Sequence, residues 1–395
     1  MSLMRTALIL GLLSAVSPFA IDMYLPAMPA IEADLNTTVA GTQMTVTAYF
    51  LSFGLAQLIY GPLADRYGRK PPIFLGLGIF LAGTIASAVA PDIRWLIAAR
   101  FVQGLGGAAL MVVPRAIIRD LHTGPQATKL MAMIMLVISV SPMLAPLAGS
   151  GVIAIGGWRA VFWVIAAASL VSLALLTIAQ PETLKPENRA PIEPASLLKN
   201  AAILFRDPTF MGLTFVGGLG IASFFVFLTS APFVYTGQFG LSPTGFAVAF
   251  AVNAIGFFAA SQLAGPLGER LGMNPMVFWG TAGFAAMASL LVLVVLGGGA
   301  SLYVVVGMLF LANACLGLVI PSTMVMALDP HPEIAGLASS LGGTLQMLAG
   351  AVAVTLAGPF FDGTALPMVA AIALCGVLAL GIAAVLVKPW QSARA

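Results

Sequence analysis

Two ionisable side chains lie inside long apolar stretches of the sequence. Asp22 occurs in the segment FAIDMYLP (19–26), and Arg100 occurs in the segment LIAARFVQ (96–103). A charge at the centre of a bilayer costs at least about 2.5–3.5 kcal/mol, so ionisable residues inside membrane spans usually serve a function. If these stretches cross a membrane, Asp22 can bind and release a proton, and Arg100 can stabilise the deprotonated carboxylate.

The sequence offers little for covalent or metal chemistry. It contains two cysteines, Cys315 and Cys375, both inside apolar runs, and two histidines, His122 and His331. These residues are too few for a metal-ligand cluster or a Cys/His nucleophile arrangement. We therefore expect unreactive thiols, no enzyme activity, no metal, and no cofactor other than a proton as coupling ion.

The composition is typical of an integral membrane protein. Hydrophobic residues make up 60% of the 395 residues and charged residues only 8%, whereas soluble domains are about one quarter charged. The net charge of +3 is too small, and the basic residues are too scattered, for a nucleic-acid surface. We expect a lipid bilayer around the chain and no nucleic-acid partner.

Apolar runs of about 20 residues, the length of a helix that crosses a bilayer, predict an all-α membrane protein with twelve transmembrane helices. The predicted spans are 5–29, 42–63, 72–90, 94–117, 128–151, 159–180, 209–234, 244–266, 275–296, 300–327, 334–358 and 366–387. With a rise of 1.5 Å per residue, Asp22 and Arg100 each lie roughly 10 Å below the outer interface. At matching depth, we expect the two side chains to share a hydrogen-bond network.

The basic residues predict the orientation of these spans. If the N-terminus is cytoplasmic, the outside ends carry only Arg94 and Arg159, and almost all other Lys and Arg residues lie inside. This positive-inside bias predicts that both termini are cytoplasmic. The long connection 181–208 is predicted to be a cytoplasmic linker between six-helix bundles at 1–180 and 209–395. Its segment SLLKNAAILF could form a surface helix.

An internal repeat supports the two halves. GPLADRYG (61–68) follows the second predicted span, and GPLGERLG (265–272) follows the eighth. The octets share Gly-Pro-Leu, the arginine and the final glycine, with Glu269 in place of Asp65. A repeat at an offset of about half the chain is typical of transporters built from two related six-helix halves.

Several motifs resemble those of the major facilitator superfamily. GPLADRYGRKP (61–71) is similar to the superfamily's loop between the second and third spans, G-x-L-x-D-R-x-G-R-K/R. LIAARFVQGLGGAA (96–109) and SVSPMLAPLAGSG (139–151) resemble the fourth-span and fifth-span motifs of its drug/proton antiporters. DMYLP (22–26) and WRAVF (158–162) resemble segments of the Bcr/CflA (bicyclomycin/chloramphenicol resistance) family. The sequence is identified as a member of that family, which implies the major facilitator fold.

The loop motif has a physical interpretation. The predicted conformational-switch residues are Gly61, Asp65, Arg66, Gly68, Arg69, Lys70 and, at the end of the fourth span, Asp120. The glycines permit tight turns, and Arg69 can reach Asp120. The resemblance implies that Asp65 contacts the start of the eleventh span near Glu333 and latches the outward-open state. The alternative is a loop that only sets the topology.

The fifth-span motif leaves two interpretations open. Pro142 and Pro146 would bend the helix, and Gly149 would let another helix approach closely. This is consistent with an antiporter hinge or with a plain packing kink. Ala145 stands where many family members have a glycine before the proline.

The predicted function is proton-coupled antiport that exports amphipathic drugs or related small molecules by alternating access. We expect a monomer in the inner (plasma) membrane of a bacterium. The candidate substrate-binding residues are Asp22, Tyr49, Gln57, Phe224, Asn253, Asn313 and Gln346. An apolar, aromatic wall with one carboxylate and a few amides suits such compounds better than sugars. The alternative is a narrow-specificity transporter of a single metabolite, such as an amino acid derivative.

Overall fold

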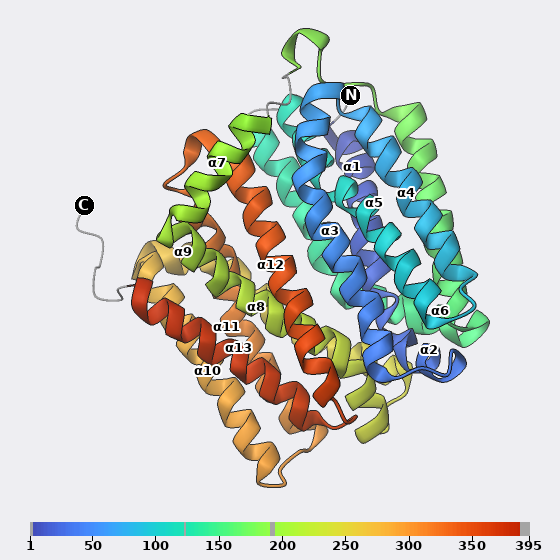
Figure 1. The fold of residues 1–395 in the computed structure, drawn as a ribbon, viewed down its shortest axis with the longest axis vertical. Helices are drawn as coiled ribbons and strands as arrows, with labels where there is room; N and C mark the ends of the chain where they lie inside the picture. Colours follow the sequence, from blue (N-terminus) through green and yellow to red (C-terminus); the bar gives the residue numbers. More distant parts are fainter. Residues whose placement is uncertain (1–2, 122–123, 190–193, 388–395) are drawn as a thin grey trace. The chain divides into compact units, whose positions relative to one another are not determined.

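The structure is a computed structural model that describes residues 3–121, 124–189 and 194–387, and no strand occurs in these ranges (Figure 1). The predicted all-α class is therefore confirmed. The chain divides into two compact units, Met1–Glu193 and Pro194–Ala395. His122, residues 190–193 of the predicted linker and residues 388–395 of the predicted C-terminal bundle lie outside the described residues.

The N-terminal unit consists of long helices and short helical turns. They are α1 (Leu3–Asp22), η1 (Leu25–Ala27), α2 (Met28–Asp34), α3 (Val39–Tyr67), α4 (Lys70–Ala88), α5 (Ile93–Leu121), α6 (Gly124–Ala179) and η2 (Pro186–Asn188). Helix α5 packs against both α3 and α4, and α1 packs against α6. This arrangement places the predicted proton carrier at the end of α1, beside α6.

Helix α6 contains two of the predicted spans. Its 56 residues would extend about 84 Å as one helix, far more than the roughly 30 Å of a bilayer's hydrocarbon core. Gly157 has φ 70° and ψ −177°, a non-helical conformation that separates the two spans. Among the described residues, eleven helices are long and apolar enough to cross a membrane. The merged pair accounts for the difference from the twelve predicted spans.

The C-terminal unit begins with a short helix. Its elements are α7 (Pro194–Arg206), α8 (Pro208–Phe233), η3 (Val234–Gln238), α9 (Pro243–Leu271), α10 (Met273–Leu296), α11 (Leu302–Leu328), η4 (Pro332–Ile334), α12 (Ala335–Ala357), η5 (Gly358–Phe360) and α13 (Ala365–Leu386). Helix α8 packs against α12 and α13, and α11 packs against α9. The helix predicted within the linker is present as α7.

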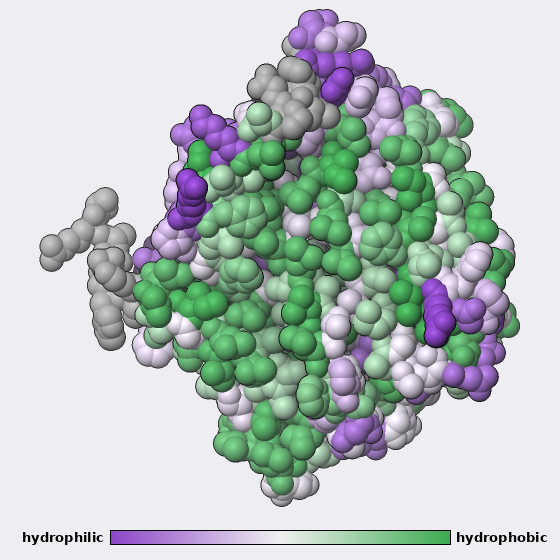
Figure 2. Space-filling view, viewed as in Figure 1, coloured by the Kyte–Doolittle hydropathy of each residue, from purple (hydrophilic) through white to green (hydrophobic). Residues whose placement is uncertain are grey.

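The surface of the long helices is apolar. Figure 2 shows hydrophobic side chains over the spans, with hydrophilic ones gathered toward the helix ends. Large apolar side chains such as Ile155, Leu293 and Leu356 are exposed. Soluble monomers rarely expose apolar patches beyond a few hundred Å², whereas lipid tails solvate such side chains. The chain is therefore a multi-pass membrane protein.

Candidate functional site

Asp22 lies at the point where α1 ends. Pro26 has no N–H to donate to the Asp22 carbonyl four residues earlier, and α1 gives way to the 3-10 turn η1, which begins at Leu25. The Asp22 side chain is buried, and its Oδ2 accepts a hydrogen bond of 2.9 Å from the Ser141 hydroxyl. Ser141 is itself fully buried, in the first half of α6. A carboxyl group is thus held inside the span region by a neutral donor.

Arg100 lies fully buried on α5, within a shell of aromatic and amide groups. Its Nη1 donates to the side-chain oxygen of Gln103, and the Gln103 amide donates to the Thr84 hydroxyl at 2.7 Å. The guanidinium carbon lies 4.7 Å from the ring centroid of Tyr24 and 4.6 Å from that of Tyr49. Two aromatic faces therefore stabilise the positive charge through cation–π contacts.

Two of the Arg100 nitrogens remain without a partner. Neither Nε nor Nη2 has a hydrogen-bond partner in the described part of the chain. Burying an unpaired donor costs free energy, so the N–H groups of these two nitrogens are available to an acceptor that enters the span region.

The expected network between Asp22 and Arg100 is not formed. None of the ion pairs among the described residues joins them. Arg100 approaches α1 at the carbonyl of Ala20, at 3.4 Å. Asp22 follows two residues later, a turn of about 200° around the helix axis, and it faces Ser141 instead. The depth estimate concerned only the position along the membrane normal and contained no information about rotation around the helix axes.

Tyr49, a predicted substrate residue, belongs to the shell around Arg100. Its hydroxyl lies 2.7 Å from the Ser17 hydroxyl, and the Tyr24 hydroxyl lies 2.6 Å from that of Thr45. Gln57 lies half-buried farther along α3, about 12 Å from Tyr49 by helical rise. The structure thus brings Tyr49 to Arg100 and leaves Gln57 apart.

The fifth-span motif packs against the end of α1. Helix α6 continues through Pro142 and Pro146. A Cβ atom at Gly149 would collide with the backbone of Met23, the residue after Asp22. The absence of a side chain at Gly149 therefore permits the close approach that the sequence predicts, and Ser141 lies on the same helix. The hinge function stays a prediction.

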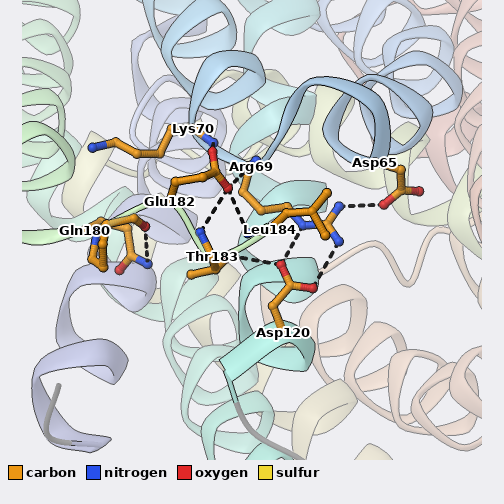
Figure 3. Close-up of polar contacts among 9 residues, drawn as sticks. Asp65, Arg69, Lys70, Asp120, Gln180, Glu182, Thr183 and Leu184 are labelled. Carbon is orange, nitrogen blue, oxygen red and sulfur yellow. Dashed lines mark hydrogen bonds and ion pairs between the residues drawn. The ribbon is translucent and has the colours of Figure 1, made fainter. Parts of the chain in front are cut away.

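A second polar cluster lies where α3 and α5 end (Figure 3). The Arg69 guanidinium donates from Nε and Nη2 to the two carboxylate oxygens of Asp120, at 2.7 and 3.0 Å. Its Nη1 forms an ion pair with Asp65. The predicted contact between Arg69 and Asp120 is therefore confirmed, and its two parallel hydrogen bonds are the strong form of such a pair. Arg66 and Lys70 lie over the rings of Tyr67 and Phe74 instead.

Glu182 completes this cluster, although the sequence motifs did not indicate it. Its carboxylate accepts hydrogen bonds from the backbone N–H groups of Arg69 and Lys70, at 2.8 and 3.0 Å, where α4 begins. It also accepts from the N–H groups of Thr183 and Leu184. Partial burial alone would raise the pKa of Glu182, but these four hydrogen bonds outweigh it and hold the pKa below its usual value. A helix N-terminus favours such an anion.

Two neighbouring residues make this contact possible. Gly68 has φ 95°, and a Cβ there would lie 2.7 Å from a Glu182 oxygen. The Thr183 hydroxyl donates to Asp120 at 2.9 Å. The segment after the sixth span is therefore hydrogen-bonded both to the start of α4 and to Asp120 at the end of α5. An acid directly after the sixth predicted span is the sequence signal that could have identified Glu182.

The candidate residues of the C-terminal unit fall into separate places. Asn253 and Asn313 are buried and meet through a hydrogen bond of 3.4 Å. Gln346 lies near Gly217 of α8, in the lining of a small pocket with Phe210 and Thr214. Phe224 is half-buried on α8. Only the two asparagines therefore form a polar contact with each other.

The sequence profile of the Major Facilitator Superfamily matches residues 10–354. The chain belongs to this superfamily. It is 31% identical over 376 residues to the bicyclomycin resistance protein homolog of Haemophilus influenzae, covering 94% of each chain. It is also 31% identical over 357 residues to multidrug resistance protein D of Escherichia coli, covering 88% of this chain and 87% of the relative. As a member of this superfamily the chain is a transporter, and the resemblance inferred from the motifs is confirmed.

The superfamily fold is also found among solved structures. The crystal structure of a D-xylose-proton symporter aligns with a TM-score of 0.79 over 99% of both chains, at 16% sequence identity. At this identity the match concerns the fold alone. The predicted major facilitator fold is thereby confirmed.

Proposed function

We propose that this transporter exports amphipathic drugs or related small molecules from the cytoplasm in exchange for protons. The relatives named above are drug resistance proteins, which supports the substrate class. The observation that carries the coupling is Asp22, a buried carboxyl whose described hydrogen bond comes from the neutral Ser141. A carboxyl in a fixed ion pair is held in its charged form, whereas Asp22 is free to exchange a proton.

The exchange cycle follows from that chemistry. A proton from outside neutralises Asp22 and lets the protein change to its inward-facing state. Cytoplasmic substrate then favours the deprotonated form, and the return step carries the substrate outward while the proton leaves inside. Arg100 supplies a buried positive charge near α1 that stabilises the deprotonated Asp22 carboxylate. One charge moved through about 100 mV supplies roughly 2.3 kcal/mol, enough for an approximately 50-fold gradient.

We further propose that the protein lies in the bacterial inner membrane with both termini in the cytoplasm. The positive-inside distribution of Lys and Arg supports cytoplasmic termini, and the bacterial relatives support the inner membrane. In this orientation the cluster of Arg69, Asp120 and Glu182 lies on the cytoplasmic side. We also propose that Asp65 latches the outward-open state, since its ion pair with Arg69 ties the end of α3, which carries it, to the start of α4. We also propose that the protein is a monomer.

Drug-driven proton movement in proteoliposomes tests the coupling. Asp22→Asn should reduce it to the level of empty liposomes. Glu32→Gln is the matched control, because it neutralises an acid of the following helix that is not part of the buried cluster, and it should retain coupled flux. Coupled flux that survives Asp22→Asn would remove Asp22 from the mechanism.

Counterflow across a panel of amphipathic drugs and small metabolites tests the substrate class. Several structurally unrelated drugs should exchange. A single accepted metabolite would favour the narrow-specificity alternative instead.

A further inference from the structure

Helix α7 presents three distinct faces. One face, with Leu197, Asn200, Ala201 and Leu204, is buried or half-buried, where α7 packs against α8 and α12. These positions follow the helical spacing of three and four residues. Leu204 is fully buried. The helix is therefore anchored to the C-terminal unit along one side, and its remaining faces are free to meet other molecules.

A second face is apolar and exposed. Leu198 is 73% exposed and Phe205 is 51% exposed. The two residues lie seven positions apart, which places them on the same side of the helix within about 20°. Two large exposed apolar side chains thus lie two turns apart on one side of α7.

The third face is basic. Lys199 and Arg206 are exposed and also lie seven positions apart. Each follows one of the apolar residues, so the basic face is turned by about 100° from the apolar face. Figure 2 shows hydrophilic side chains in the region of α7, at the upper left, with apolar surface beside them.

The connection to α8 brings α7 to the membrane surface. Only Asp207 separates α7 from Pro208, where the membrane-spanning helix α8 starts. The Asp207 N–H closes α7 on the carbonyls of Ile203 and Leu204, both at 3.2 Å, and its carboxylate caps α8 through the N–H of Thr209 at 2.8 Å. Because α7 is tied to the end of a span, it lies close to the level at which lipid headgroups and acyl chains meet.

We propose that α7 is an interfacial helix that binds anionic phospholipid in the adjacent leaflet, which is the cytoplasmic one in the orientation proposed above. The apolar face, Leu198 and Phe205, enters the boundary between headgroups and acyl chains. The basic face, Lys199 and Arg206, binds the phosphates. Apolar insertion combined with cations on the polar side is the pattern of helices that lie in this plane, and the charge complements an anionic leaflet.

Lipid titration followed by native mass spectrometry tests the charge requirement on the full chain. Phosphatidylglycerol should bind the wild type more tightly than phosphatidylethanolamine with the same acyl chains. Lys199→Gln/Arg206→Gln should weaken phosphatidylglycerol binding by roughly 25-fold, about fivefold per charge or about 1 kcal/mol each. Lys185→Gln is the control, since Lys185 is exposed on a non-helical part of the linker. No loss in the double variant, or an equal loss for both lipids, would overturn the proposal.

Spin labels test the position of the apolar face. Cysteines at positions 198 and 199, in a chain in which Cys315 and Cys375 are replaced by alanine, carry the label in liposomes that contain phosphatidylglycerol. The label at 198 should collide with dissolved oxygen, which concentrates in lipid, and the label at 199 with a water-soluble nickel complex. A label at 198 that meets mainly the nickel complex places this face in water and overturns the proposal. A label at 198 that is shielded from both indicates a protein partner and overturns it as well.

Discussion

In the N-terminal unit, α3 ends at Tyr67 and Gly68 follows with φ 95°; in the C-terminal unit, α9 ends at Leu271 and Gly272 follows with φ 87°. The repeated octets therefore form the same local backbone. Arg69 follows Gly68 and binds Asp65 and Asp120. Met273 follows Gly272, and no ion pair is described for Glu269 or Arg270 in the residues that the structure covers.

The same contrast holds inside the spans. The N-terminal unit buries Asp22 and Arg100, whereas the C-terminal unit buries the neutral pair Asn253 and Asn313. The two halves thus share the backbone turn, which depends on a glycine, while their charged groups differ. We infer that proton chemistry and the loop network belong to the N-terminal unit, and that the C-terminal unit supplies neutral surface for the substrate.

Arg69→Met gives the N-terminal loop the residue type found in its repeat. Asp120 loses two parallel hydrogen bonds and Asp65 loses its ion pair, so we expect the free energy of unfolding to fall by about 2–3 kcal/mol. Thermal unfolding of the purified protein measures this. Arg66→Met, at an exposed arginine of the same loop, should change it by less than about 0.5 kcal/mol. Equal effects of the two variants would show that the contacts of Arg69 with Asp65 and Asp120 do not stabilise the protein.

Glu182→Gln should destabilise the protein by about 1 kcal/mol. The amide keeps the size of the side chain but loses the charge and one acceptor oxygen at the start of α4, as in the loss of a helix cap. Glu187→Gln, at an exposed acid of the same segment, is the control and should be neutral. A Glu187 effect as large as that of Glu182 would contradict the assignment of the cap.

The difference in melting temperature between the wild type and Glu182→Gln should depend on pH. The pKa of Glu182 is lowered in the folded protein, so its contribution is present above the unfolded value of about 4.3. It is lost as the pH falls through the lower folded value. Melting temperatures should therefore differ most near pH 7 and converge as the pH falls below the unfolded value. A difference that stays constant over this interval would exclude a role for the carboxylate charge.

Asn313→Leu should have the smallest effect. Its hydrogen bond to Asn253 is long, at 3.4 Å, so the loss of stability should stay below about 1 kcal/mol. Proton coupling in proteoliposomes should be unchanged, while the accepted substrates shift toward more apolar compounds. Loss of coupling in this variant would contradict the inference that proton chemistry belongs to the N-terminal unit alone.

Much of the fold could be predicted from sequence, because lipid imposes a simple rule on each span. Backbone groups in hydrocarbon must bond within their own helix, so apolar runs translate directly into helices. The predicted span 209–234 corresponds to α8 at Pro208–Phe233, and 275–296 to α10 at Met273–Leu296. The contact of Arg69 with Asp120 could also be predicted, because both residues lie at span ends on one side of the membrane.

The sequence by itself determined that Asp22 and Arg100 are buried, since both interrupt long apolar runs and hydropathy is a property of the chain alone. Only the tertiary structure decided that Asp22 faces Ser141, that Arg100 lies between the rings of Tyr24 and Tyr49, and that Glu182 caps α4. The contacts of Asp22 and Arg100 depend on how each helix is rotated about its axis. The contact of Glu182 depends on the path of the segment after α6, which brings it to the start of α4. Rotation is set by packing between helices that are distant in the chain, and an apolar stretch that is hydrophobic on every side carries no periodic signal for it.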